Sequence, residues 1–229
     1  MKIRELLGTA QVPGGEELRL YSHDRDFMIA LGHNELMSTR MRGSEEALAV
    51  MTLERISGVV GPHVLIGGYG MGFTLRATLA GMGAKGQAVV AELIPEIIDW
   101  ARGPMRDVAA GCLDDPRVRL MMGDVSDAIV MATGDYDAIL LDVDNGPDGL
   151  VRKDNNRLYN KQGLAAAKRA LRVGGVLAIW SAGKDDVFAR RIERAGFEVE
   201  EVLVSARGNA PDGKKGKGPR HVIWFARRV

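Results

Sequence analysis

The sequence predicts a doubly wound α/β fold, Rossmann-like, with a mostly parallel seven-stranded sheet. Three observations support this. From Val59 onward, short apolar runs alternate with helical patterns, as parallel strands with covering helices require. A glycine cluster at 67–72 follows the first of these runs. The last two runs have no helix between them, so we expect them to pair as an antiparallel hairpin at one edge.

Residues 1–57 are expected to form a separate unit, a small N-terminal β-hairpin followed by a linking helix. Two short apolar runs, 17–21 and 27–31, are divided by a polar turn and predict the two strands. Ser44 is a candidate N-cap, followed by Glu45 and Glu46 in the first turn of a helix that stops near Gly58. The predicted boundary therefore divides the chain into residues 1–57 and 58–229.

The second unit, residues 58–229, carries the main sheet. Its strands are expected at 63–66, 88–91, 117–122, 136–142, 176–180, 197–205 and 221–226, and its helices at 73–82, 95–106, 126–132, 162–171 and 185–195. Five strand–helix units followed by a terminal hairpin resemble the class I S-adenosylmethionine (SAM) methyltransferases.

Composition narrows the class of protein. The 229 residues are 46% hydrophobic, with 31 Lys+Arg against 30 Asp+Glu, so the net charge of +1 argues against nucleic acid as a partner. No apolar run approaches the roughly 20 residues that span a bilayer, and no signal peptide is expected at the start. The single Cys112 excludes an internal disulfide, and the four histidines lack metal-ligand spacing. We expect a cytoplasmic protein without a membrane or metal site.

The glycine loop Gly67-Gly-Tyr-Gly-Met-Gly72 favours a nucleoside ligand. Glycines between a strand and a helix allow a tight turn and bring a ligand close to backbone N–H groups. Gly68, Gly70 and Gly72 fit G-x-G-x-G, whereas dinucleotide enzymes carry G-x-G-x-x-G and P-loops carry Lys-Ser/Thr. The expected cofactor-binding residues here are Gly67, Gly68, Tyr69, Gly70 and Gly72.

Two acidic residues extend this nucleoside site. Glu92 ends the second strand, where a carboxylate can bind two ribose hydroxyls; by itself it could equally be a solvated surface residue. Asp124 ends the third strand and could accept a hydrogen bond from an adenine amino group, or cap the helix that follows, or do both. The neighbours Leu93 and Val125 are expected to line the same pocket.

The fourth strand carries the candidate catalytic groups. Asp142 and Asp144 follow it, at the edge of the sheet where ligands bind in open parallel sheets. A carboxylate there can hold an ammonium group and accept its proton, and a second carboxylate nearby raises the pKa of the first. The alternative is a polar turn, with Asp142 as a buried hydrogen-bonding residue.

These motifs together resemble the spermidine synthase-like branch of the SAM methyltransferase superfamily. The matching segments are Gly67-Gly68 with Thr74-Leu75-Arg76, then Ala91-Glu92-Leu-Ile-Pro95-Glu96-Ile97, Asp124, Asp137 to Asp142, Leu158-Tyr159 and Leu171-Arg-Val-Gly-Gly175. The resemblance implies SAM or decarboxylated SAM as cofactor, a homodimer, and Asp144 and Tyr159 at the substrate. Three segments depart from the family. The glycine loop has Tyr69 and Met71 and no acid, and Arg40-Met-Arg-Gly-Ser-Glu45 replaces a Tyr-His-Glu type segment. The fourth-strand motif D-x-x-D-P-x-G-P is shortened to Asp142-Val-Asp144-Asn-Gly-Pro147.

The expected function is therefore SAM-dependent transfer, foremost of a methyl group to a small amine-type or other nucleophilic acceptor. An acid in the glycine loop would oppose the carboxylate of SAM, so its absence favours SAM over the decarboxylated form. Aminopropyl transfer from decarboxylated SAM to a diamine is the alternative within the same class. A non-catalytic nucleoside-binding protein remains open. A nucleic-acid methyltransferase that uses the basic loop at 208–219 is disfavoured by the charge balance.

Overall fold

The main sheet has seven strands in the order β10-β11-β9-β8-β5-β6-β7. A computed structural model of the chain describes residues 4–32, 34–143, 156–208 and 218–229. Strands β5 to β9 are parallel, while β11 is antiparallel to both β9 and β10, so the predicted fold class and terminal hairpin are confirmed. The strands are β5 (His63–Gly67), β6 (Gln87–Glu92), β7 (Val118–Met122), β8 (Tyr136–Leu141), β9 (Leu171–Ser181), β10 (Phe197–Ser205) and β11 (Arg220–Arg228).

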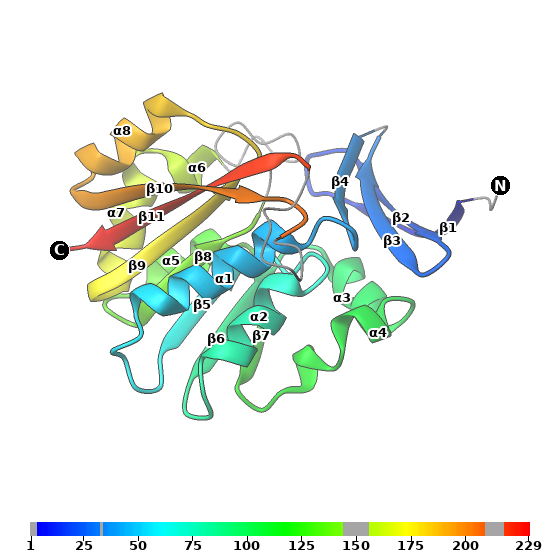
Figure 1. Cartoon of the computed structure of the whole chain (residues 1–229), viewed down its shortest axis with the longest axis horizontal. Helices are drawn as coiled ribbons and strands as arrows, with labels where there is room; N and C mark the ends of the chain where they lie inside the picture. Colours follow the sequence, from blue (N-terminus) through cyan, green and yellow to red (C-terminus); the bar gives the residue numbers. More distant parts are fainter. Residues whose placement is uncertain (1–3, 33, 144–155, 209–217) are drawn as a thin grey trace.

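Helices cover both faces of this sheet (Figure 1). Side chains alternate along a strand, so Ile66 of β5 packs with Leu48 and Leu75 on one face, while Leu65 packs with Leu164 on the other. The helices are α1 (Gly43–Arg55), α2 (Phe73–Gly81), α3 (Pro95–Arg102), α4 (Arg106–Ala109), the 3-10 helix η1 (Cys112–Asp114), α5 (Val125–Met131), α6 (Asn156–Tyr159), α7 (Lys161–Ala170) and α8 (Asp186–Arg194). Within the described ranges, no helix is long and apolar enough to cross a membrane.

The N-terminal unit is a four-stranded antiparallel sheet, which contains the predicted hairpin and has two strands more than the sequence predicts. Its strands β1 (Glu5–Gln11), β2 (Glu17–His23), β3 (Asp26–Leu31) and β4 (Asn34–Ser38) pair in chain order. The two central strands are those that the sequence predicts. The outer strands β1 and β4 each bury only one residue, so they lack the apolar alternation that reveals a strand. Gly8 of β1 lies against the indole of Trp100, which docks this sheet on α3.

Helix α1 begins differently from the prediction. Ser44 does not cap it, because the helix begins at Gly43 and Arg42 occupies the N-cap position. The hydroxyl of Ser44 contacts His221 instead. The N–H of Gly43 donates to the carbonyl of Ala206 at 2.9 Å, and a Cβ at Gly43 would lie 1.9 Å from the nitrogen of Gly208. Only glycine allows this approach. The helix packs on α2 and β9, so the domain boundary at residue 57 stays a proposal.

Candidate functional site

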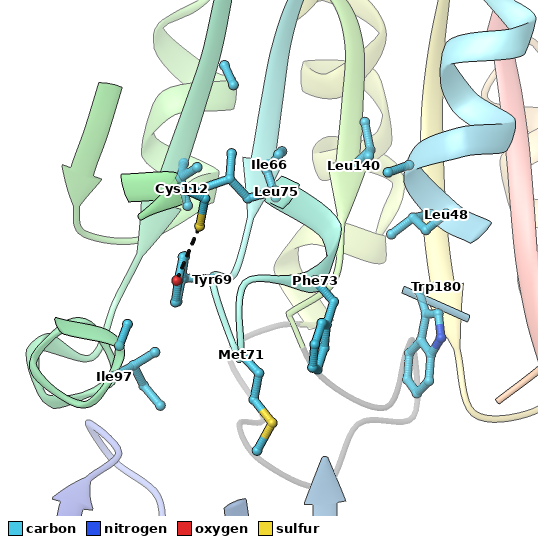
Figure 2. Packing of buried hydrophobic residues seen from close by; sticks show 14 of the residues in the cluster. Leu48, Ile66, Tyr69, Met71, Phe73, Leu75, Ile97, Cys112, Leu140 and Trp180 are labelled. Atoms are coloured by element: carbon cyan, nitrogen blue, oxygen red, sulfur yellow. Dashed lines mark hydrogen bonds between the residues drawn. The ribbon is translucent and has the colours of Figure 1, made fainter. Parts of the chain in front are cut away.

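A cavity of about 360 Å³ lies at the carboxyl ends of the parallel strands, where open α/β sheets bind ligands. Six strands that neighbour one another in the sheet each contribute one residue to its floor at this edge. These residues are Asp124 after β7, Glu92 on β6, Gly68 after β5, Asp142 after β8, Trp180 on β9 and His221 at the start of the antiparallel strand β11. Apolar side chains of the N-terminal unit, including Leu18, Ile29 and Met37, close the opposite wall. Figure 2 shows Met71, Phe73 and Trp180 at these strand ends, their side chains pointing the same way.

Of the residues predicted for the site, seven line this cavity: Gly68, Gly70, Glu92, Leu93, Asp124, Val125 and Asp142. Gly67, Tyr69 and Gly72 support the loop from behind and are not part of the lining. Tyr159 is buried among the side chains of the opposite face, edge-on to Phe188, and does not line the cavity either. Asp144 and residues 209–217 of the basic loop lie outside the described residues.

The glycine loop needs its glycines. Gly68, Gly70 and Gly72 have φ of +86°, +55° and +82°, which L side chains rarely adopt. A Cβ at Gly68 would lie 2.4 Å from the carbonyl oxygen of Asp142, so the loop closes directly on the end of β8. The Tyr69 ring turns into the core, with its hydroxyl 3.5 Å from the sulfur of Cys112 (Figure 2). A ligand at this loop meets backbone at Gly68 and Gly70.

Glu92 is a buried carboxylate held by backbone donors. Its Oε2 accepts from the N–H of Tyr69 at 2.8 Å and its Oε1 from the N–H of Ile94 at 2.9 Å. Burial raises the pKa of Glu92, although these hydrogen bonds oppose the increase. Backbone hydrogen bonds from Leu93 and Gly70 also lower the pKa of this carboxyl group. The side chain is therefore fixed in place by backbone donors at the wall of the cavity.

Asp124 does cap helix α5, because its Oδ1 accepts from the N–H of Ser126 at 2.9 Å. Its Oδ2 pairs with Nη2 of Arg157 at 2.6 Å. The hydrogen bonds to Ser126 and Arg157 outweigh desolvation by burial, and the pKa of Asp124 is lowered. The capping role is confirmed; the ligand role is compatible with it and stays a prediction.

Asp142 shares the cavity with a second carboxylate, Glu45, which the sequence analysis missed. Thr74 donates from Oγ1 to Oδ2 of Asp142 at 2.7 Å. Burial raises the pKa of Asp142 to about 6, against the lowering effect of that hydrogen bond. Burial, followed by the charge of Asp142, holds the pKa of Glu45 well above its ordinary value. Because the charge of Asp142 disfavours ionisation of Glu45, a cation bound at this pair would favour the charged form of Glu45.

Ser44 and His221 form a second polar group in the same cavity. The Oγ of Ser44 lies 2.9 Å from Nδ1 of His221, although the two residues are 177 positions apart. The ring of Trp180 packs edge-on against His221, with 4.7 Å between ring centroids. Burial lowers the pKa of His221, which keeps its imidazole neutral near pH 7. In the described part of the chain, no cluster of His, Cys, Asp or Glu is arranged to hold a metal.

Residues 44–189, more than half of the chain, match the family model of the spermine/spermidine synthase domain. The chain belongs to this family. It is 38% identical over 120 residues to a polyamine aminopropyltransferase of Mycobacterium tuberculosis H37Rv, a match that covers 51% of this chain and 22% of the relative. A polyamine aminopropyltransferase of Korarchaeum cryptofilum is 31% identical over 150 residues, which cover 65% of this chain and 44% of that protein.

Solved structures agree on the fold. The crystal structure of spermidine synthase from Thermotoga maritima superposes with a TM-score of 0.75 at 20% identity, over 98% of this chain and 73% of that one. A spermidine synthase in complex with the transition state analogue AdoDATO gives 0.73, also at 20% identity, over 98% and 72%. The curated relatives are considerably longer, since this chain spans 22% and 44% of the two named above.

The expectation of methyl transfer is wrong. The family match and the aminopropyltransferase relatives favour the alternative, in which an aminopropyl group is moved. The glycine loop itself contains no acidic residue, and this absence is the reason why the sequence favours SAM over the decarboxylated form. The folded chain brings Glu45 into that cavity from the start of α1. A carboxylate is thus present without being part of the loop.

Proposed function

We propose that this transferase moves the aminopropyl group of decarboxylated SAM to the amino group of a small amine. The observation that carries the proposal is the carboxylate pair of Glu45 and Asp142, which shares one cavity with the glycine loop and Glu92. Such a cavity combines a nucleoside end with an end suited to cations. Membership of the spermine/spermidine synthase family supports the same activity.

The donor is held along β5 to β7. Glu92, whose carboxylate lines the cavity and is held by backbone N–H groups, accepts hydrogen bonds from the two ribose hydroxyls. Asp124 accepts from the adenine amino group, between the apolar side chains of Leu93 and Val125. Gly68 and Gly70 let the rest of the donor approach the backbone of the loop.

The acceptor amine is held at Asp142 and Glu45. An amine reaches the enzyme protonated and must lose a proton before its lone pair can attack. Asp142 accepts that proton, and its pKa of about 6 makes it a stronger base than an ordinary aspartate. The lone pair then forms the new C–N bond while the C–S bond breaks and its electrons return to sulfur, leaving a neutral thioether. The protein's main contribution is alignment of the two reactants.

A donor comparison tests the proposal. The purified protein is incubated with a primary amine and either decarboxylated SAM or SAM, and the thioether product of each donor is quantified. We expect methylthioadenosine from decarboxylated SAM and no methylated amine from SAM. Asp142→Asn should lower kcat by about 10²–10⁴, whereas the exposed matched change Asp127→Asn should not. Methyl transfer, or full activity of Asp142→Asn, contradicts the proposal. The homodimer and the cytoplasmic location stay predictions.

A further inference from the structure

His221 presents a hydrogen-bond donor to the cavity. Ser44 is fully buried, and within the described residues its hydroxyl has one partner, Nδ1 of His221. If Nδ1 carried the ring hydrogen, the hydroxyl hydrogen of Ser44 would be buried without an acceptor, which is costly. The hydroxyl therefore donates to Nδ1, and the neutral ring carries its hydrogen on Nε2. No described residue accepts a hydrogen bond from that Nε2.

A second N–H group without a partner lies beside His221. The indole N–H of Trp180, whose ring packs against His221, has no hydrogen-bond partner among the described residues. The carboxylates Glu35, Glu45 and Asp142 also line the cavity. The end of the cavity that holds the amine substrate therefore combines carboxylates with the neutral N–H group of His221, and these favour different chemical groups.

The separation of Asp142 and His221 in the cavity suits a short molecule. Asp142 follows β8, and His221 lies on β11, with β9 as the strand between them. Neighbouring strands are about 4.8 Å apart, so the backbones of β8 and β11 are roughly 10 Å apart. The side chains of Asp142 and His221 both reach from these strand ends into one cavity of about 360 Å³, which shortens the span between their polar atoms. A chain of a few atoms with a functional group at each end can reach both residues.

We propose that His221, held by Ser44, donates a hydrogen bond to the end of the amine substrate that lies away from its reacting nitrogen. His221 thereby selects amines that carry an oxygen at that end. The inference rests on the proposed function and names its acceptor class as short amino alcohols, in preference to diamines. A hydroxyl oxygen accepts from the Nε2–H, whereas a far ammonium has only donors and opposes it. His221 acts here as a positioning and specificity residue.

A matched pair of acceptors tests this selection. 3-Aminopropan-1-ol and 1,3-diaminopropane have the same length, and kcat/KM for each is measured with decarboxylated SAM. We expect the wild type to prefer the amino alcohol by about tenfold. His221→Phe keeps a ring against Trp180 but removes the donor, so it should abolish the preference, mainly through KM. His221→Gln offers an amide N–H and should retain part of it; Ser44→Ala should lose less than His221→Phe.

Binding measurements separate failure of this inference from failure of the proposed function. Calorimetry with methylthioadenosine should give the same Kd for every variant, which shows that the nucleoside end is intact. The role of His221 is overturned if the wild type prefers the diamine. It is also overturned if His221→Phe leaves the ratio of kcat/KM for the amino alcohol to kcat/KM for the diamine unchanged. If no amine is turned over, the proposed function fails instead. The two acceptors are then titrated into the methylthioadenosine complex, where equal affinities overturn the inference and a preference lost in His221→Phe supports it.

Discussion

Replacement of Glu92 by glutamine is the sharpest test of the donor site. The carboxylate accepts hydrogen bonds from the backbone N–H groups of Tyr69 and Ile94, and in the proposed function it also accepts from the ribose hydroxyls. Glutamine has the same shape but one acceptor oxygen, so it cannot serve both the backbone and the diol. Hydrogen bonds to a charged group contribute about 1.5–3 kcal/mol each. Loss of one of them corresponds to roughly a 10- to 150-fold weaker Kd.

The assay is calorimetric titration with methylthioadenosine and with its 2′-deoxy analogue. The wild type should bind the ribose form more tightly. Glu92→Gln should raise the Kd of methylthioadenosine by the full 10- to 150-fold. The Kd of the 2′-deoxy analogue should rise much less, because that analogue lacks one of the affected hydroxyls. Asp99→Asn, an exposed change on the nearby helix α3, serves as the matched control. Equal losses for the two ligands would refute the assignment of Glu92 to the ribose.

Three further predictions concern the acceptor end and the start of α1. Thr74→Val removes the hydrogen bond that favours ionised Asp142, so the acidic limb of the kcat/KM profile should move up by about one pH unit. Because the pKa of Asp142 is raised to about 6, folding stability falls as pH rises from about 4 to 6; Asp142→Asn should raise Tm at pH 7 and leave it unchanged at pH 4. Gly43→Ala places a Cβ 1.9 Å from Gly208 and should cost about 1–3 kcal/mol in urea unfolding, whereas Gly58→Ala, with open space around it, should not.

The sequence predicts those parts of the molecule that depend on local signals. The glycine loop, Glu92 and Asp124 each follow a strand whose apolar run is visible in the sequence, and parallel strands bring their carboxyl ends together. Asp142 enters the same cavity for the same reason. The parallel direction of the strands in the main sheet follows from the alternation of strands and helices. Strand position thus explains why these residues could be found without a structure.

The other half of the cavity could not be predicted in this way. Ser44 looks like an ordinary N-cap, and His221 looks like an isolated histidine before a short apolar run. Their contact exists only because the terminal hairpin folds back beside α1. Glu45 likewise gives no local sign that it faces Asp142. Since the chemistry at this end comes from residues that are distant in sequence, the preferred donor and acceptor could not be read from the motifs alone.

The order of strands at the carboxyl-terminal edge has a consequence for synthesis of the protein. Strand β11 is made last, yet it lies between β9 and β10 in the sheet. On the ribosome, the nucleoside end from β5 to β7 can assemble early, because all of its residues emerge before Arg157. The wall that carries His221 forms only after β11 has left the exit tunnel as well. A nascent chain therefore completes the proposed nucleoside end of the cavity before the proposed amine end.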